Sequence, residues 1–394
     1  MDFYYDESYQ CSALNFDGKD VNVSHQSNPE FYIGCFIGSD DWNAITPQLL
    51  ALEQEYKTKN GFTTDGELKS NNLVKSQDVK DGFSSLSSRT VKFYQSLFNI
   101  INNHVAIHLV VFNKYEEIFR STFPNITWFE QHHYDYRSFI YGWTKFFKHH
   151  QSYDILSILY SYKNTKWKVK QLTEIFENHL NKIYSLDKKK EEIQAIQEWI
   201  YIINGHDFYF IDVKRKIPWD YNKIATSFKV FCESQSIIPN KIGIDNHQQT
   251  VECMQIRFPQ TKAIDSINSI QVRVCDWLVG LFGRIMLAYD SIMTSKYNQS
   301  IEFENTLPLL SDKSFILNEE QKTLVLSMYY IFLEQQEGYW STTTSLYADM
   351  VGLFYEFIRY IHKCNSNKIK VNADDFNKDL AFELHRQFNN IKGD

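Results

Sequence analysis

The chain has 394 residues, more than one hydrophobic core usually organises, so we expect two packed units or one domain with large insertions. A content of 43% hydrophobic and 16% aromatic residues excludes an intrinsically disordered protein. The formal net charge of −7 argues against a protein covered with basic residues that bind nucleic acid over its whole surface.

The first predicted element is a strand in "DFYYDES", residues 2–8. Side chains alternate along a strand, so Asp6 and Ser8 are expected on one face and Glu7 on the other. Asp6 ends an apolar run, where an unpaired charge is costly. The strand therefore predicts that Asp6 has a partner, although Asp6 and Ser8 could also simply form a turn.

Apolar runs predict three further strands, at 30–38, 104–112 and 240–246, each covered on both faces. The stretches 125–217 and 309–394 lack proline and show helical periodicity. Together these patterns predict an α/β fold with flanking helices. Residues 1–124 and 208–300 would form the two halves of the core, 125–207 a large helical insertion and 301–394 a helical C-terminal extension.

A lysine-rich segment lies inside the predicted insertion. Residues 145–190 contain ten lysines and four acids, interleaved with aromatic residues. A basic surface with aromatic side chains is what contact with a nucleic-acid backbone requires. A solvated helical face explains the same pattern.

Two further acids, Glu67 and Asp245, lie at positions where a ligand site is expected. Glu67 lies in "DGELKSN" and is followed by Lys69 and Ser70. Asp245 ends the strand "KIGID", and open α/β sheets bind ligands at the carboxyl ends of their strands. A helix cap and an Asx turn are the structural alternatives for these two acids.

Asp276 lies in "SIQVRVCDWLVGLFGRI", the most apolar helical stretch of the chain. Gly280 and Gly283 follow at i+4 and i+7, so the face of Asp276 could lie close to a sheet. Arg273, at i−3, is predicted on the same face, where it could bind substrate or form an ion pair with Asp276.

Four converging carboxylates, Asp6, Glu67, Asp245 and Asp276, would repel one another unless a cation lies between them. Mg²⁺ prefers oxygen ligands and is often bound by carboxylates together with substrate phosphates, so we expect Mg²⁺ or Mn²⁺. Lys69 would then neutralise a phosphate oxygen. Ser8, Arg273 and His247 are expected near the substrate, His247 as an accessory to Asp245; a structural role in the loop is the favoured interpretation of His247.

The order "YYDES", "GELKS", "GID" and "VRVCDWLVGLFGR" resembles the prokaryotic domain-of-unknown-function family numbered 3800. The resemblance covers about residues 1–120 and 208–290. It implies an RNase H-like fold and a metal-dependent nuclease, of a kind found in mobile elements or phage defence. By this resemblance Asp6, Glu67 and Asp276 match the family's acidic motifs, and Asp245 matches its later strand-end acid. The family has glutamine where this chain has Arg273.

Two histidine pairs suggest a second type of chemistry, metal-free acid-base cleavage of RNA. They are His132 with His133 and His149 with His150. No nucleophile or acid stands at a fixed spacing from them, so surface positions or phosphate contacts are the better interpretation.

A non-catalytic module that binds nucleic acid or protein is the alternative function. In that case the nuclease-like core is a scaffold, and an apolar helix at 345–364 could serve an interface. A protein or RNA partner could bind through the insertion or the extension.

Six cysteines without a CxxC pair predict reduced thiols in the core. Acids at positions 2, 6 and 7 and the lack of a long apolar run exclude a secretory signal and a membrane-spanning helix. The expected location is the cytoplasm, without a membrane partner.

Overall fold

The structure is a computed structural model that describes residues 1–9, 13–16, 29–63, 66–102, 104–150, 153–186, 189–213, 216–302, 309–334 and 340–380. Among these residues no helix is both long enough and apolar enough to cross a bilayer. The described cysteines are free thiols, as predicted, and four of these five are buried. Cys11 lies outside the described residues.

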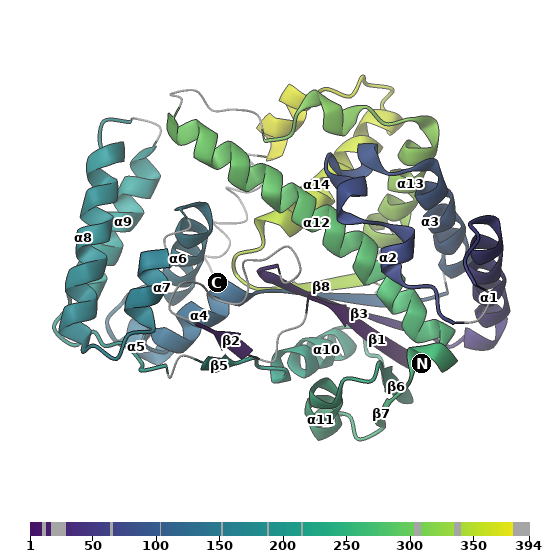
Figure 1. Ribbon diagram of the computed structural model, residues 1–394, viewed down its shortest axis with the longest axis horizontal. Helices are drawn as coiled ribbons and strands as arrows, with labels where there is room; N and C mark the ends of the chain where they lie inside the picture. Colours follow the sequence, from purple (N-terminus) through teal and green to yellow (C-terminus); the bar gives the residue numbers. More distant parts are fainter. Residues whose placement is uncertain are drawn as a thin grey trace.

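A six-stranded mixed sheet lies at the centre of the molecule, in the order β7-β6-β1-β3-β4-β8 (Figure 1). Its strands are β1 (Asp2–Ser8), β3 (Phe31–Ser39), β4 (Ala106–Asn113), β6 (Lys241–Ile244), β7 (Thr261–Ala263) and β8 (Trp340–Thr344). β3 is antiparallel to β1 and β4, whereas β6 is parallel to β1, β7 to β6, and β8 to β4. A separate two-stranded sheet pairs β2 (Ala13–Asn15) with β5 (Lys216–Pro218). The predicted α/β sheet with flanking helices is confirmed.

The apolar runs form the strands because both faces of the sheet are covered. Every residue of β3 and β4 is buried. Gly34 on β3 lets the Tyr5 side chain lie against the backbone of β3, because a Cβ atom at position 34 would lie 2.2 Å from the hydroxyl oxygen of Tyr5. The glycine thus makes room for a large aromatic side chain of β1 inside the core.

Two separate hydrophobic cores lie on the two faces of the sheet. Tyr4, Ile33 and Ile37 belong to the first core, and Phe3, Tyr5 and Phe36 to the second, as strand alternation requires. The helices of the first core are α1 (Trp42–Lys59), α2 (Ser70–Leu73), α3 (Ser88–Ile101), α12 (Ile270–Glu302), α13 (Glu319–Tyr329) and α14 (Asp349–Ser366). The long helix α12 packs directly on β1 and β3, above the sheet in Figure 1.

The second core joins the opposite face of the sheet to a helical unit between β4 and β5 and to two helices that follow β5. The helices of the unit are α4 (Lys114–Thr122), α5 (Ile126–Gln131), α6 (Tyr136–His150), α7 (Tyr153–Leu159), α8 (Thr165–Ile183) and α9 (Lys190–Ile203). The two later helices are α10 (Asn222–Ser234) and α11 (Gln248–Arg257). Helices α8 and α9 lie at the left end of the molecule in Figure 1, and α10 and α11 lie below the sheet. The stretch 125–207 is therefore helical where it is described, as its periodicity predicts.

The C-terminal stretch is not purely helical, in contrast to the prediction. Residues 340–344 form β8, which extends the sheet beside β4. The segment reads "WSTTT", and β-branched threonines favour a strand. The prediction missed this strand because helical periodicity surrounds the short segment on both sides.

Candidate active site

Two of the predicted acids lie side by side at the ends of parallel strands. In the register of β1 with β6, Tyr5 lies opposite Ile244, and the backbone N–H of Asp245 donates to the Tyr5 carbonyl at 3.2 Å. Asp6 directly follows Tyr5, and Asp245 directly follows Ile244. They therefore occupy neighbouring positions at the carboxyl edge of the sheet, where open α/β sheets bind ligands.

Asp6 is directed towards the face of the sheet that α12 covers. Tyr4 on the same side of β1 belongs to the core of that face, and Ser8 ends the strand on that side opposite Ile33. Burial raises the pKa of Asp6 well above its usual value, and the negative charges of Asp276 and Asp245 raise it further. Asp276 and Asp245 are therefore each close enough to Asp6 to repel its carboxylate.

Helix α12 brings Asp276 to this edge by close packing against α2. The carboxylate accepts hydrogen bonds from the backbone N–H of Ser70 at 2.7 Å and from its hydroxyl at 2.8 Å. A Cβ atom at Gly280 would lie 2.2 Å from the Cβ atom of Ser70, and one at Gly283 would lie 3.2 Å from Ile33 of β3. The glycine face that the sequence predicts does allow this close approach.

The ionised form of the Asp276 carboxyl group is unfavourable in spite of its hydrogen bonds. Burial raises its pKa, against the hydrogen bonds from Ser70 and the positive charge of Lys69. A cation at this edge of the sheet would lower the pKa of Asp276 and of Asp6 together.

Glu67 lies just before α2 and forms an ion pair with Lys69. Burial lowers the pKa of the Lys69 ammonium, but the hydrogen bond and charge of Glu67, with the charges of Asp276 and Asp245, raise it above its usual value. The second carboxylate oxygen of Glu67, Oε2, is buried and has no hydrogen-bond partner among the described residues. A buried carboxylate oxygen without a partner fits a metal ligand.

Asp276 and Asp245 act on Asp6, and Glu67 is connected to them only through Lys69; the four acids do not form a compact ligand cage. Among the described residues, no three of them bring ligand atoms within 4.8 Å of one another. Lys69 and Ser70 already hold two of the carboxylates. Cation binding would therefore require side-chain rotations at this edge of the sheet.

Arg273 does not belong to this site, which corrects the prediction that it shares the face of Asp276 and contacts substrate. Its guanidinium is buried and donates to Glu53 at 2.9 Å and to the carbonyls of Ser266 and Ile267. These bonds hold α12 to α1 and to the preceding turn. The partner Glu53 lies on another helix, so helical spacing around Asp276 does not reveal it.

His247 does not join Asp245 as an accessory to the acids; it lies on the other face of β1, in the structural role that is its favoured interpretation. Its Nδ1 atom is 3.2 Å from Oε1 of Glu7 and 2.7 Å from the hydroxyl of Thr250. Glu7 also accepts a hydrogen bond from Tyr32. The alternation that directs Glu7 away from Asp6 is confirmed, and His247 follows Glu7 rather than Asp245.

Sequence reasoning missed Arg284 as a cation near the acids. Its positive charge acts on Asp276, and its guanidinium donates to the carbonyl of Gly280 at 2.6 Å and to the side chain of Asn71. Arg284 lies eight residues after Asp276, two turns along the same helix face. That spacing was a usable signal for a cation near the site.

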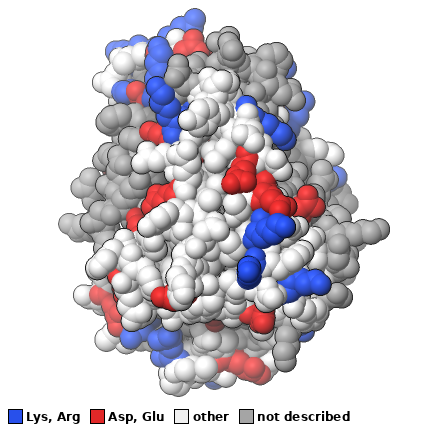
Figure 2. Space-filling model, turned by 90° about the vertical axis from the view of Figure 1, so that its left-hand side faces the viewer, with Lys and Arg blue, Asp and Glu red and all other residues white. Residues whose placement is uncertain are grey.

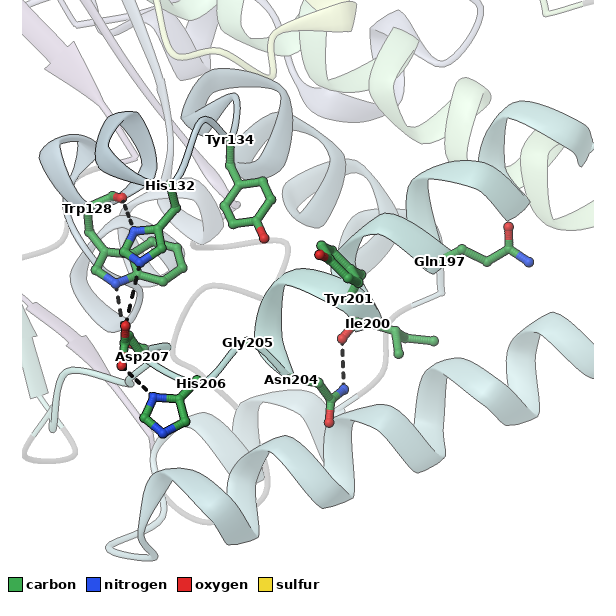
Figure 3. Close-up of a pocket in the computed structure, with 10 residues that line it drawn as sticks. All are labelled: Trp128, His132, Tyr134, Gln197, Ile200, Tyr201, Asn204, Gly205, His206 and Asp207. Carbon is green, nitrogen blue, oxygen red and sulfur yellow. Dashed lines mark hydrogen bonds and ion pairs between the residues drawn. The ribbon is translucent and has the colours of Figure 1, made fainter.

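His132 and His149, one from each histidine pair of the helical unit, have structural surroundings. His132 stacks on Trp128, with 4.2 Å between ring centroids, and its Nε2 atom is 3.9 Å from Oδ2 of Asp207 (Figure 3). These residues and Tyr134 line a groove of about 600 Å³. His149 is buried, so the expectation of a surface position is wrong for it. The four acids line neither this groove nor the pocket between α13 and α14.

The lysine-rich segment does not form a uniformly basic surface. Figure 2, which views the α8 and α9 end of the molecule, shows Lys and Arg beside Asp and Glu on a largely uncharged surface. Several of these lysines form ion pairs with acids of the same chain: Lys145, Lys148, Lys168, Lys170 and Lys189. Lys148 and Lys168 are buried, so part of the segment packs inside the molecule and does not form a solvated face. Contact with nucleic acid through this segment stays a prediction.

The chain was compared with known protein families, curated proteins and solved structures. No family model matches the chain, and neither a curated protein nor a solved structure matches it.

Proposed function

We propose that this protein is a metal-dependent nuclease that hydrolyses nucleic-acid phosphodiesters at the acidic edge of an RNase H-like sheet. The observation that carries the proposal is the juxtaposition of Asp6 and Asp245 at the ends of parallel strands, with Asp276 close enough to raise the pKa of Asp6. Repelling carboxylates at a ligand-binding edge are typical of a cation site.

The strand arrangement supports the RNase H-like interpretation. Without β8, the sheet consists of three antiparallel strands, β1, β3 and β4, followed by β6 and β7, which add in parallel on the other side of β1. An RNase H-like sheet has this order and these directions. In that arrangement acids at the ends of the first and fourth strands and on a later helix belong to one site.

Asp6, Glu67, Asp245 and Asp276 would hold the cation, and the unpartnered oxygen of Glu67 offers a ligand. Bound Mg²⁺ or Mn²⁺ supplies an activated water and stabilises the leaving oxygen. Lys69 has an exposed side chain, so its ammonium can bind a phosphate oxygen once it releases Glu67. Ser70 orients Asp276 through two hydrogen bonds and keeps its carboxylate at the strand ends.

A cleavage assay tests the proposal on labelled single-stranded DNA, single-stranded RNA, duplex DNA and an RNA–DNA hybrid, with Mg²⁺, Mn²⁺ or a chelator. We expect metal-dependent cleavage of at least one substrate and a loss of more than about 100-fold in Asp6→Asn and Asp276→Asn, since each removes a ligand. Asp2→Asn is the matched control, because Asp2 lies on the same side of β1 at its other end.

The result also separates the two candidate functions. Cleavage that survives in both aspartate variants would place the activity elsewhere and refute the site. No cleavage with either metal, combined with binding to one of these nucleic acids, would favour the non-catalytic module. Glu67 and Asp276 already have partners in the chain, and this observation favours that alternative.

A further inference from the structure

Three helices of the helical unit bring two imidazoles and a carboxylate together, away from the acidic edge of the sheet. His150 ends α6, His179 lies on α8 and Glu192 on α9. One oxygen, Oε1 of Glu192, is 3.2 Å from Nε2 of His150 and 2.9 Å from Nε2 of His179. Among the described residues, this is the single trio of His, Cys, Asp or Glu whose ligand atoms all lie within 4.8 Å of one another.

These distances fit a shared metal ion. Nitrogen and oxygen ligands of Zn²⁺ lie at about 2.0–2.2 Å, so two ligands of a tetrahedral ion are separated by about 3.3 Å. The two measured separations differ from this value by less than about half an ångström, which small rotations of the side chains would supply. Imidazole nitrogen and carboxylate oxygen are ligands that Zn²⁺ and related ions accept.

The surroundings of the trio resemble the outer shell of a metal site. Lys189 donates to the other oxygen of Glu192, Oε2, at 2.9 Å, and so fixes the carboxylate with Oε1 towards the histidines. The ring of Phe146 lies 4.3 Å from that of His150 and 5.1 Å from that of His179, measured between centroids. Hydrogen-bonded ligands within a partly apolar shell are typical of protein metal sites.

We propose that His150, His179 and Glu192 bind one divalent transition-metal ion of the Zn²⁺ class. Three protein ligands leave a fourth position for water, as in zinc sites that are not closed by four side chains. Since the ligands come from α6, α8 and α9, the ion would join the three helices.

A neutral imidazole and an ionised carboxylate are the forms in which these side chains bind a metal ion. The alternative is a metal-free network in which both imidazoles donate to Glu192. That network predicts no response to added metal, which distinguishes it from the proposal.

The test is a titration of the chelator-treated full chain with Co²⁺, followed by visible absorption, and with Zn²⁺, followed by calorimetry. We expect one Co²⁺ per chain with the absorption bands of a nitrogen-ligated ion, besides any Co²⁺ that the carboxylates of the proposed nuclease site bind, and displacement of the nitrogen-ligated Co²⁺ by Zn²⁺. At a Zn²⁺ concentration 100 times Kd, the unfolding temperature should rise by about 3 °C.

Variants locate the ion. His179→Gln and His150→Gln should each weaken Co²⁺ binding by more than about tenfold. His206→Ala is the matched control in the same helical unit, because the His206 side chain is 99% exposed, and it should bind Co²⁺ like the wild type. Asp6→Asn should also bind like the wild type, which separates this site from the proposed nuclease site.

Three outcomes would overturn the assignment: no Co²⁺ bands and no Zn²⁺ heat with the wild-type chain, a Co²⁺ affinity in both histidine variants equal to that of the wild type, or loss of the nitrogen-ligated Co²⁺ bands in Asp6→Asn. The wild-type titration decides the matter even if a variant does not fold.

Discussion

Replacing Asp6 by Asn should stabilise the metal-free protein at neutral pH. Adjacent strands lie about 4.8 Å apart, so ionised carboxylates at the neighbouring positions Asp6 and Asp245 repel by roughly 3 kcal/mol at an effective dielectric constant of about 20. Asp245 is only partly buried, and solvent screens part of this energy. We therefore expect a gain of about 1–2 kcal/mol, or about 1–3 °C in the unfolding temperature of a chain of this length.

Asn is the suitable replacement because it keeps the local hydrogen bond. The Oδ1 atom of Asp6 accepts from the backbone N–H of Glu7 at 2.7 Å, and an amide oxygen can accept this bond as well. Asp2→Asn serves again as the control and should change the unfolding temperature by less than about 1 °C.

The pH dependence of this effect has a definite sign. Burial and neighbouring charges raise the pKa of Asp6 in the folded state. The folded protein then binds the proton more tightly than the unfolded chain, so the contribution of Asp6 to stability is full below the unfolded pKa of about 4 and is lost as pH rises through the folded pKa. The advantage of Asp6→Asn should be absent at pH 3 and greatest at pH 8.

The assay is thermal unfolding of both variants and the wild type in chelator at several pH values, then with Mg²⁺. Mg²⁺ should stabilise the wild type more than Asp6→Asn, because the variant lacks one ligand. If Asp6→Asn instead unfolds more than about 2 °C below the wild type at pH 8 without metal, Asp6 is a structural hydrogen-bond acceptor and the repulsion argument is wrong.

Three further predictions concern the packing around the site and one buried histidine. Gly280→Ala should lower the free energy of unfolding by about 1–2 kcal/mol in urea denaturation, because its Cβ atom meets Ser70 and separates α12 from α2; an unchanged value would contradict the close approach. Ser70→Ala should cost about 1 kcal/mol and reduce cleavage, since Asp276 loses the hydroxyl donor at 2.8 Å; equal cleavage rates would remove Ser70 from the site. Burial lowers the pKa of His108 to about 3, so stability should fall by about 3 kcal/mol between pH 7 and pH 4 through this residue; His108→Gln should flatten that part of the pH–stability curve, and an identical slope would argue against the neutral buried ring.

The strands could be predicted because their chemistry is local. The runs at 30–38 and 104–112 are apolar at successive positions, which suits only a strand buried on both faces, and the structure places β3 and β4 there. The alternation of "YYDES" likewise gave the correct faces for Asp6 and Glu7. β8 was missed since five residues between helices carry little periodicity.

Partners that depend on tertiary structure could not be read from spacing. Arg273 lies on α12 like Asp276, but its partner Glu53 comes from a helix that only the fold brings close. His150 and Glu192 are 42 residues apart in sequence, with His179 between them at no motif spacing. Their approach depends on how α6, α8 and α9 cross, and sequence periodicity does not determine helix crossing.

The two acids of β1 show why the α12 face is the better candidate for chemistry. Glu7 has partners for its carboxylate on the second face of the sheet: Tyr32 donates a hydrogen bond to it, and Nδ1 of His247 lies 3.2 Å away. Asp6 has a backbone hydrogen bond and two aspartates that raise its pKa. A buried carboxylate with donors around it is stabilised in its charged form, whereas carboxylates that repel one another are relieved by protonation or by a cation between them. The asymmetry across one strand therefore assigns structure to Glu7 and, in our proposal, cation binding to Asp6.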